Sequence, residues 1–385
     1  MTSLEYVHQG AYGCLYHPGI NCDGTPIEDL RYATKLVIQD EMSENELYVG
    51  NAVKNIVNYS VNFVPVIESC IVNLGKVRRN NPHELDKCDI VTNASKKNKF
   101  MLMKMPYIDS LYFYEYISNM GDNKRKIISC IFDTYNYLVE SIERLMEHNI
   151  VHYDLNPANI LINLKTDTPV IIDFGLSILM DNMDKKAKKA EFWKLHFYKY
   201  SPEYYVWPLE AHVINYLQNV STSGALSRAE VESICETYVN ANDALRIFSK
   251  GFRARYLKAC IEQSEQWIGM ERDAAFKGLI AGWHTWDNYS LSIAYLQIIG
   301  FISENGFIDN KLIVKYVQLL LMNVHPDPDR RKSASDTKRA FTDMFYMNER
   351  VEMYNTIVEH FNPNAFKTII KNHSRSSKSS ISRSS

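Results

Sequence analysis

The sequence predicts an α+β fold with two lobes: a small, mostly antiparallel β lobe that carries one helix, and a larger, mainly helical lobe. Residues 1 to about 105 alternate short β-like runs with a single helical stretch near 41–58. From Lys124 onward, apolar residues recur at steps of three and four, which is typical of a helix with one buried stripe. A chain of 385 residues is long enough for such a two-lobed fold with a substantial core.

The predicted elements follow in order along the chain. The β-like runs of the first part are residues 4–7, 14–16, 32–38, 63–67 and 100–105. The buried stripe of the long helix consists of Ile127, Ile131, Tyr135, Leu138, Ile142 and Leu145. One more β-like run lies at the end of the stretch 151–164, and another lies at the start of "PVIIDFGLSI". A mainly helical half follows, in which Ser227 and Glu230 form a predicted capping box. Residues 373–385 have neither apolar periodicity nor an acidic residue, so we expect a disordered tail.

Composition and charge exclude several classes of protein. The seven cysteines are scattered and form no CxxC pair, so we expect reduced thiols in a cytosol-like compartment and neither a disulfide framework nor a zinc ribbon. The amino terminus lacks a basic start followed by an apolar run, and no stretch approaches 18 uninterrupted apolar residues, so we expect a protein that is not secreted and has no membrane span. A formal charge of −2 gives no global field that would collect nucleic acid, so we expect no nucleic-acid partner.

Three polar residues around the later β-like runs indicate phosphate chemistry. Asp154 and Asn159 stand five positions apart before one predicted strand, and Asp173 stands on the turn after the next. Two carboxylates and an amide can orient a hydroxyl and hold Mg²⁺ between phosphate oxygens, because magnesium prefers hard oxygen ligands and usually takes one or two carboxylates besides the substrate phosphates. A polar turn between two apolar elements is the alternative explanation for Asp154 and Asn159.

These residues resemble the protein kinase superfamily. "HYDLNPAN", which contains His152, is similar to the catalytic loop of that family, and "DFG" at 173–175 is similar to its metal-binding turn. The resemblance implies ATP and Mg²⁺ as cofactors and His152 as a support of the loop. It also implies that Asp154 accepts the proton of the substrate hydroxyl, that Asn159 binds one Mg²⁺, and that Asp173 bridges through Mg²⁺ to the β and γ phosphates.

Further matches lie upstream. "HQGAYGCLY" resembles the glycine-rich loop of the family, with His8 where the first glycine usually stands, so that Gly10 and Gly13 remain to let backbone N–H groups approach phosphate. A plain hairpin turn is the alternative for this stretch. "YATK" follows and makes Lys35 the candidate for the α and β phosphates, the alternative being an exposed strand lysine.

The lysine requires an acidic partner on the next helix, and the adenine requires a hinge. "MSENELYVGNAV" offers Glu46 as the favoured partner and Glu44 as the second choice, since spacing does not decide between helix neighbours. "KFMLMKMPYID" has the apolar pattern of the strand that leads into the hinge, with Met103 as the gatekeeper. The resemblance then implies that the backbone near Lys104 and Met105 contacts adenine.

Three features downstream separate protein kinases from related phosphotransferases. "SPE" at 201–203 stands where the family has APE, and "WDNYSLSIAYL" resembles its DxWS helix, with Asp287 holding the backbone of the catalytic loop. "HPDPDRRKSASD" resembles the closing DPxxRxSA element, which makes Arg331 the ion-pair partner of Glu203. Because the stretch from Glu203 to Asp287 is much longer than in the family, residues near 208–282 form a predicted helical insertion, either a docking platform for a partner or a brace.

The predicted domains are an ATP-binding lobe over residues 1–105, a catalytic lobe over 106–365 and the tail. The chain departs from the family at several points. The arginine of HRD is Tyr153 here, so no cation stands there to receive an activation-loop phosphate. The lysine two residues after the catalytic aspartate is Asn156, and by counting back from SPE the activation-segment threonine is His196. Since lysine and threonine contact each other in the family, both losses resemble one coupled change, and we expect a slower enzyme.

The sequence therefore predicts a protein kinase that transfers the γ-phosphoryl group of ATP with Mg²⁺ to protein hydroxyls, of Ser or Thr rather than Tyr. One alternative is a small-molecule phosphotransferase of the aminoglycoside or choline kinase type. The other is a pseudokinase scaffold that works through the insertion and tail. The substitutions resemble those of the divergent kinases of large eukaryotic DNA viruses, so the expected location is the cytoplasm, including host cytoplasm or virion for a viral protein.

Overall fold

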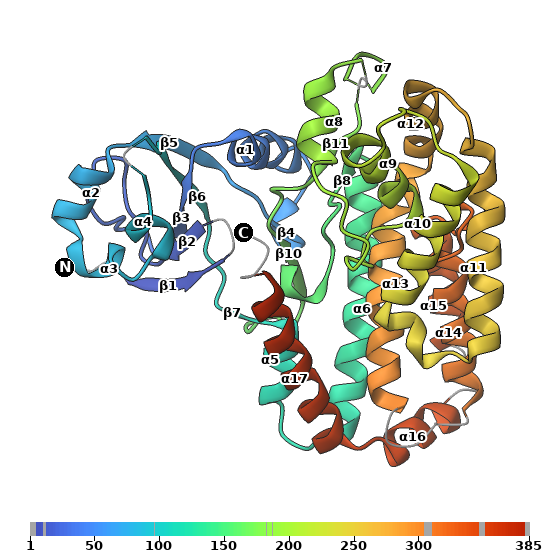
Figure 1. Cartoon of the computed structure of the whole chain (residues 1–385). Coiled ribbons are helices and arrows are strands. Elements are labelled where there is room, and N and C mark those ends of the chain that lie inside the picture. The colour runs from blue at the N-terminus through green and yellow to red at the C-terminus, as the bar shows by residue number, and fades with distance from the viewer. Residues whose placement is uncertain are drawn as a thin grey trace. The chain divides into compact units, whose positions relative to one another are not determined.

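The computed structural model describes residues 5–10, 13–95, 97–181, 183–186, 188–303, 310–345 and 351–381 (Figure 1). The chain divides into two compact units, which are described separately. The first comprises Met1–Leu111, Asn159–Leu179 and Ser374–Ser385, and the second comprises Tyr112–Ala158 and Met180–His373. The first contains most of the strands and the second most of the helices, so the predicted α+β class with a β lobe and a helical lobe is confirmed.

The main sheet of the first unit has five antiparallel strands in the order β1-β2-β3-β6-β5. These strands are β1 (Tyr6–Gln9), β2 (Gly13–Tyr16), β3 (Tyr32–Ile38), β5 (Glu68–Val72) and β6 (Phe100–Pro106). Because successive side chains of a strand point to opposite faces, Leu36 enters a core with Cys14 and Leu102, whereas Val37 enters a second core with Met101 and Met103. Lys35 alternates with Leu36 and therefore lies on the same face as Val37.

Short helices α2 (Leu74–Asn80), α3 (Pro82–Leu85) and α4 (Asp89–Thr92) supply apolar side chains to the first of these cores. Helix α1 (Glu41–Val53) supplies Leu47 to the second. Asp40 and Ser43 cap its start with a capping box, in which each side chain accepts a hydrogen bond from the backbone N–H of the other. A Cβ atom at Gly50 would lie 2.6 Å from the carbonyl oxygen of Val66, so glycine lets the helix approach this backbone closely.

A second sheet in the first unit has the order β4-β10-β9-β7. Its strands are β4 (Phe63–Val64), β7 (Ser110–Tyr112), β9 (Ile160–Asn163) and β10 (Pro169–Ile172); η1 (Tyr59–Val61) precedes β4, η2 (Pro157–Asn159) precedes β9, and β11 (Ile178–Leu179) follows β10. Strands β9 and β10 form an antiparallel hairpin in which Ile160 pairs with Ile171. Asn159 and Asp173 therefore stand at the same, open end of this hairpin.

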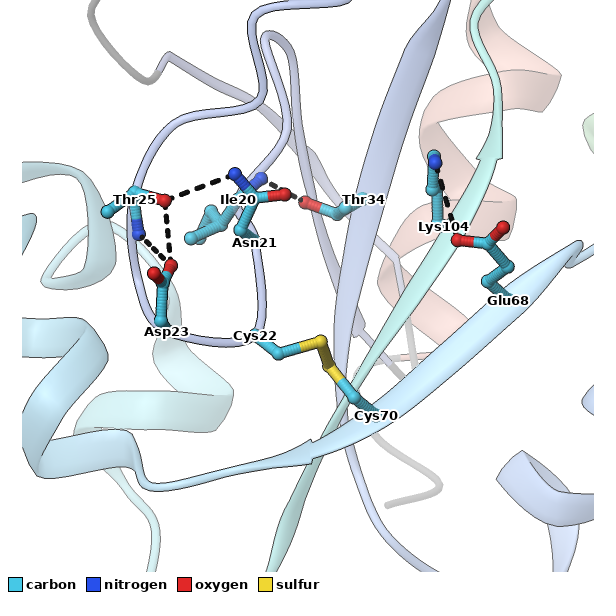
Figure 2. Close-up of a disulfide and its surroundings, with 9 residues drawn as sticks. All are labelled: Ile20, Asn21, Cys22, Asp23, Thr25, Thr34, Glu68, Cys70 and Lys104. Carbon is cyan, nitrogen blue, oxygen red and sulfur yellow. Dashed lines mark hydrogen bonds and ion pairs between the residues drawn. A yellow bond between two sulfur atoms is a disulfide. The ribbon is translucent and has the colours of Figure 1, made fainter.

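Two disulfides tie the first unit together, which corrects the prediction of reduced thiols. Cys14 pairs with Cys88, and Cys22 pairs with Cys70. The first links β2 to the residue that precedes α4. The second, which Figure 2 shows, links the loop after β2 to β5. Near Cys22 the loop is also held by the backbone N–H of Ile20, which donates to Thr34 Oγ1 at 2.9 Å. Sequence spacing gave no sign of these pairs because their partners are 74 and 48 residues apart.

The second unit is built around the long helix α6 (Lys124–Met146), which packs against α13 (Trp286–Ser303) and α15 (Ala334–Phe345). Every residue of the predicted stripe of α6 is fully buried, so that prediction is confirmed. The rings of Tyr135, Tyr316 and Phe341 contact one another in this core at centroid distances of 5.2 to 5.6 Å. Other elements are β8 (Ile150–Val151), α5 (Phe113–Asn119), α7 (Met183–Lys186), α8 (Ala190–His196), α14 (Lys311–Asn323), η6 (Pro328–Arg330), α16 (Val351–His360) and α17 (Pro363–Ile381).

The region of the predicted insertion is helical: α9 (Leu209–Asn219), α10 (Arg228–Ala241), η3 (Asp243–Ile247), α11 (Lys250–Ser264), η4 (Glu265–Trp267), α12 (Arg272–Ile280) and η5 (Ala281–Thr285). The capping box of Ser227 and Glu230 begins α10 as predicted. Tyr256 donates to the carbonyl oxygen of Val324 at 2.6 Å, and the hydroxyls of Tyr238 and Tyr289 are hydrogen-bonded to each other. These buried contacts attach the inserted helices to the rest of the second unit, as a brace would.

At the carboxyl end, α17 extends to Ile381 and so continues into the segment that composition predicts to be disordered. Residues 382–385 of that segment lie outside the described residues. Among the helices that the structure describes, none is both long and apolar enough to cross a membrane.

Reduction of the two disulfides should lower the thermal stability of the protein. A disulfide typically contributes about 2–4 kcal/mol, and the Cys22–Cys70 loop is nested inside the Cys14–Cys88 loop, so the two contributions should not add fully. Thermal unfolding with and without dithiothreitol measures the effect, and non-reducing peptide mapping should recover both linked pairs. An unchanged melting temperature, together with no linked peptides, would contradict the pairing.

Candidate active site

The first unit brings three of the predicted site residues together around one ammonium group. Lys35 Nζ, on β3, donates to both carboxylate oxygens of Glu46 on α1, at 2.8 and 3.1 Å. Asp173 Oδ1 lies 3.8 Å from the same nitrogen. Of the two glutamates that spacing left open, the structure therefore gives Lys35 to Glu46, whereas Glu44 accepts a hydrogen bond from the side chain of Gln39.

The charged groups of this cluster affect one another. Burial raises the pKa of the Glu46 carboxyl, the Lys35 ammonium opposes that rise, and the nearby Asp173 carboxylate adds to it. The side chain of Glu46 is almost fully buried, while that of Asp173 is about one-third exposed. Lys35 thus neutralises a buried acid on one side and faces a more accessible acid on the other.

Asp173 has an unusual backbone that fixes where its carboxylate points. Its φ of 64° lies in the left-handed region, which is uncommon for a residue with a side chain and tends to occur at functional sites. Its Oδ1 accepts a hydrogen bond from the backbone N–H of Gly175 at 3.2 Å. With Asn159 at the same end of the β9–β10 hairpin, this places one carboxylate and one amide oxygen within one compact unit.

The donor set fits magnesium better than a transition metal. Within the described residues, no group of three or more His, Cys, Asp or Glu side chains could hold a metal ion. Magnesium needs no such cage, because it keeps water ligands and binds through one or two carboxylates plus phosphate oxygens. Asn159 and Asp173 are the residues that would hold it here.

A neighbour of Glu46 has a supporting role that sequence analysis missed. Asn45 Nδ2 donates to the carbonyl oxygens of Gly175 and Ser177, at 3.0 and 2.9 Å. Helix α1 thus holds the turn after Asp173 with one residue and binds Lys35 with the next. A buried polar residue adjacent to the predicted ion-pair glutamate was the available signal, but helix spacing alone does not show where its side chain points.

The predicted nucleotide-binding residues lie on the five-stranded sheet. Gly10 donates its backbone N–H to the carbonyl oxygen of Gly13 at 2.9 Å, where β1 turns into β2; residues 11 and 12 between them lie outside the described residues. A Cβ atom at Gly13 would lie only 3.0 Å from Lys35 Cγ, so this glycine allows β2 to approach the lysine closely.

The hinge residues lie at the end of β6. Met103, the predicted gatekeeper, is fully buried and pairs with Lys35 across β3 and β6. Met105 lies opposite Ala33, and the carbonyl oxygen of Lys104 accepts a hydrogen bond from Ile67. One backbone group near the predicted adenine contact, the Lys104 carbonyl, is therefore hydrogen-bonded within the first unit.

In the second unit, Asp154 is surrounded by side-chain donors. Asn156 Nδ2 donates to Asp154 Oδ1 at 3.0 Å and to the hydroxyl oxygen of Tyr204 at 3.1 Å, and the Tyr204 hydroxyl itself donates to Asp154 Oδ1. The sequence analysis assigned the position across from Asn156 to His196. That assignment is wrong: His196 is buried at the end of α8, and Tyr204 occupies the position.

The backbone of the catalytic loop is held from α13. Asp287 accepts hydrogen bonds from the backbone N–H groups of His152 and Tyr153, at 2.7 and 2.9 Å, and burial raises its pKa. Tyr153 replaces the family's arginine with a fully buried ring that stacks on Trp207 at 5.0 Å. The indole of Trp207 donates to the carbonyl oxygen of Tyr153 at 2.8 Å, so the two residues are linked twice.

The buried ion pair of the second unit differs from the predicted one. Arg331 donates to both carboxylate oxygens of Glu210 at 2.8 Å, not to Glu203, whose side chain is exposed. The family's APE therefore corresponds to "PLE" at 208–210, and the insertion begins after Glu210. The sequence carries two Pro-containing triplets that end in glutamate, and only the fold shows which one reaches the arginine.

The sheet order, the Lys35–Glu46 pair beside Asp173, and the hydrogen bonds of Asp287 to the loop of Asp154 form an arrangement similar to that of protein kinases. A family model described as Protein kinase domain matches residues 81–205. That range contains Asp154, Asn159 and Asp173, while Lys35, Glu46 and Asp287 lie outside it. In its matched part the chain is similar to members of the protein kinase superfamily.

Two curated relatives give the scale of the similarity. The chain is 34% identical over 93 residues to dual specificity protein kinase zak2 of Dictyostelium discoideum, a match that covers 22% of this chain and 14% of the relative. It is 36% identical over 74 residues to probable cell division control protein 7 homolog 2 of Encephalitozoon cuniculi, which covers 19% of each. The chain thus spans less than a fifth of the length of the curated relatives it matches.

The Arg331–Glu210 pair gives a direct test of the corrected assignment. Glu210→Gln should lower the free energy of unfolding by about 3 kcal/mol or more, because it leaves the fully buried guanidinium of Arg331 without its counter-charge. Glu203→Gln makes the same chemical change at an exposed site and should stay within about 0.5 kcal/mol of wild type. Urea unfolding of the three proteins measures both values. The reverse order would restore Glu203 as the partner.

The buried histidine of α8 predicts a specific loss of stability in acid. Burial lowers the pKa of His196 to about 4, below its ordinary value of 6.5, so the unfolded chain binds a proton that the folded chain does not. Stability should fall as pH decreases from about 6.5 towards 4. His196→Phe should remove up to about 1.4 kcal/mol per pH unit from that slope. Denaturant unfolding between pH 4 and 7 measures it, and an unchanged slope would mean that His196 is protonated when folded.

Proposed function

We propose that the protein transfers the γ-phosphoryl group of ATP to serine or threonine hydroxyls of protein substrates. The observation that carries the proposal is the position of Lys35 Nζ, 2.8 Å from Glu46 and 3.8 Å from Asp173 within one unit. An ammonium group fixed by a buried acid, with a more exposed acid on its other side, is suited to bind phosphate oxygens next to a metal ligand.

Each residue then has a defined task. Lys35 binds phosphate oxygens and is kept in place by Glu46. Asn159 and Asp173 hold magnesium, which when bound neutralises the charge that develops on the transferred group. Asp154 accepts the proton of the attacking hydroxyl, and Gly10 and Gly13 allow the backbone of the β1–β2 turn to approach phosphate. Catalysis depends on positioning and on charge neutralisation more than on covalent chemistry.

The choice of acceptor rests on the resemblance and is open to a direct check. The zak2 relative is named a dual specificity protein kinase, so both Ser/Thr and Tyr hydroxyls belong in the assay. Helices α10 and α11 are attached to the rest of the second unit through buried tyrosine hydroxyls, which supports a bracing role for the insertion rather than a docking platform. The cytoplasmic expectation loses the argument from reduced cysteines, because four of the seven are paired.

Transfer of radiolabelled phosphate from ATP to a protein mixture tests the proposal. Wild-type protein with Mg²⁺ should label protein bands, and mass spectrometry should place the phosphate on serine and threonine. Asp154→Asn should lower the rate by about 10² to 10⁴, because it removes a general base. Asp336→Asn makes the same change on an exposed residue of α15 and should match wild type.

The outcomes separate the competing functions. No labelled product at high enzyme concentration would identify a pseudokinase scaffold. Label that enters added aminoglycosides or choline, and not protein, would identify a small-molecule phosphotransferase. Equal rates for wild type and Asp154→Asn would refute the assignment of the base while leaving a transferase in place.

A further inference from the structure

The hydroxyl of Tyr204 lies at the centre of the contacts around Asp154, yet the activity proposed above assigns it no task. It donates to Asp154 Oδ1 and accepts from Asn156 Nδ2 at 3.1 Å. Asn156 Nδ2 in turn donates to the same Asp154 Oδ1 at 3.0 Å and to the Asp154 carbonyl oxygen at 3.1 Å. Three side chains thus form a closed set of hydrogen bonds, and two uncharged donors converge on one carboxylate oxygen.

The Tyr204 hydroxyl is well suited to remain a hydrogen-bond donor to Asp154. Burial, and after it the charge of Asp154, raises the pKa of the Tyr204 hydroxyl well above its ordinary value. The hydroxyl therefore stays protonated across the physiological range. A hydrogen bond to an ionised carboxylate is roughly twice as strong as one between neutral groups, so this donor restricts rotation of the carboxylate effectively.

The position of Tyr204 is itself determined by its surroundings. Its ring packs edge-on against Trp207 with centroids 5.0 Å apart, and Trp207 donates its backbone N–H to the Tyr204 carbonyl oxygen at 3.2 Å. The indole of Trp207 donates to the carbonyl oxygen of Tyr153 and stacks on its ring. Segment 204–207 is thus joined to consecutive residues of the catalytic loop, to Tyr153 through the tryptophan and to Asp154 through the tyrosine.

We propose that Tyr204 is a positioning residue: together with Asn156 it sets the orientation of the Asp154 carboxylate for proton transfer from the acceptor hydroxyl. It acts through Asp154. Both donors, the Tyr204 hydroxyl and the Asn156 amide, are uncharged, whereas the resemblance places a charged lysine at position 156. The inference rests on the proposed function, because a positioning role requires that Asp154 act as the base. It goes beyond that function because it assigns the orientation of the Asp154 carboxylate to segment 204–207.

The expected signature is a loss of turnover without a loss of nucleotide binding. Tyr204→Phe keeps the ring that packs on Trp207 and removes only the hydroxyl, so kcat should fall about tenfold to a hundredfold. KM for ATP should stay within about twofold of wild type, because Lys35, Asn159 and Asp173 are unchanged. The melting temperature of Tyr204→Phe should fall by about as much as that of the control variant described next.

Tyr205→Phe is the matched control. It removes the neighbouring hydroxyl, which donates to Gln297 Oε1 at 2.7 Å and not to Asp154. The same hydrogen-bond loss at this position should lower stability by a comparable amount and leave kcat within about twofold of wild type. A general weakening of the segment would affect both variants, whereas a positioning role affects only Tyr204→Phe.

A double-mutant cycle adds a second readout. Asn156→Ala alone should also lower kcat, and Asn156→Ala combined with Tyr204→Phe should lose clearly less than the product of the two single losses, because both donors act on one oxygen. Multiplicative losses would mean that the two side chains act independently, which contradicts the shared role.

The outcomes distinguish this inference from the proposed function. Absence of phosphoryl transfer by wild type would refute the proposed function and the inference with it. Transfer by wild type with unchanged kcat in Tyr204→Phe would refute the inference alone. A higher kcat in Tyr204→Phe would also refute it, since the hydroxyl would then be blocking Asp154 instead of positioning it.

Discussion

The first unit depends on burying one ion pair, Lys35 with Glu46. An unpaired charge in such a place would be strongly destabilising, so each partner requires the other, and the pair in turn requires that α1 and β3 keep one fixed separation. Gly50 allows α1 to approach the backbone at Val66, and the capping box at Asp40 fixes where the helix begins. The pair contributes a defined geometry more than it contributes stability, and a phosphate-binding cation needs that geometry.

In the second unit, the position of Asp154 is fixed mainly by uncharged side chains. In the resemblance that the sequence shows, an arginine and a lysine stand on either side of the catalytic aspartate; here Tyr153 and Asn156 occupy these positions. Tyr153 is buried among aromatic rings, and Asn156 donates to Asp154 and Tyr204. Polar contacts to backbone, such as that of Asp287 with His152 and Tyr153, then complete the support of the loop.

Sequence patterns predicted what is local and missed what depends on long-range pairing. The buried stripe of α6 and the capping box of α10 follow from periods of three to four residues, which a sequence displays directly. The partner of Arg331 does not, because "SPE" and "PLE" are equivalent as patterns and differ only in which glutamate the fold buries. Tyr204 was missed because a count along the sequence, which led to His196, does not show which side chain the fold brings to Asn156. The disulfides were missed because nested pairs leave no local spacing signal.

Tyr153, which stands where the resemblance places an arginine, bears on how such a protein can be regulated. An activation-loop phosphate organises a kinase when a cation beside the catalytic aspartate receives it, and that requires an accessible side chain. Tyr153 is 1% exposed, carries no charge and is covered by Trp207, so it offers a phosphate neither a counter-ion nor a route of approach. The contact of Trp207 with Tyr153 already joins the activation segment to the loop. We therefore expect packing of Trp207 on Tyr153, and not a phosphate, to join these two segments.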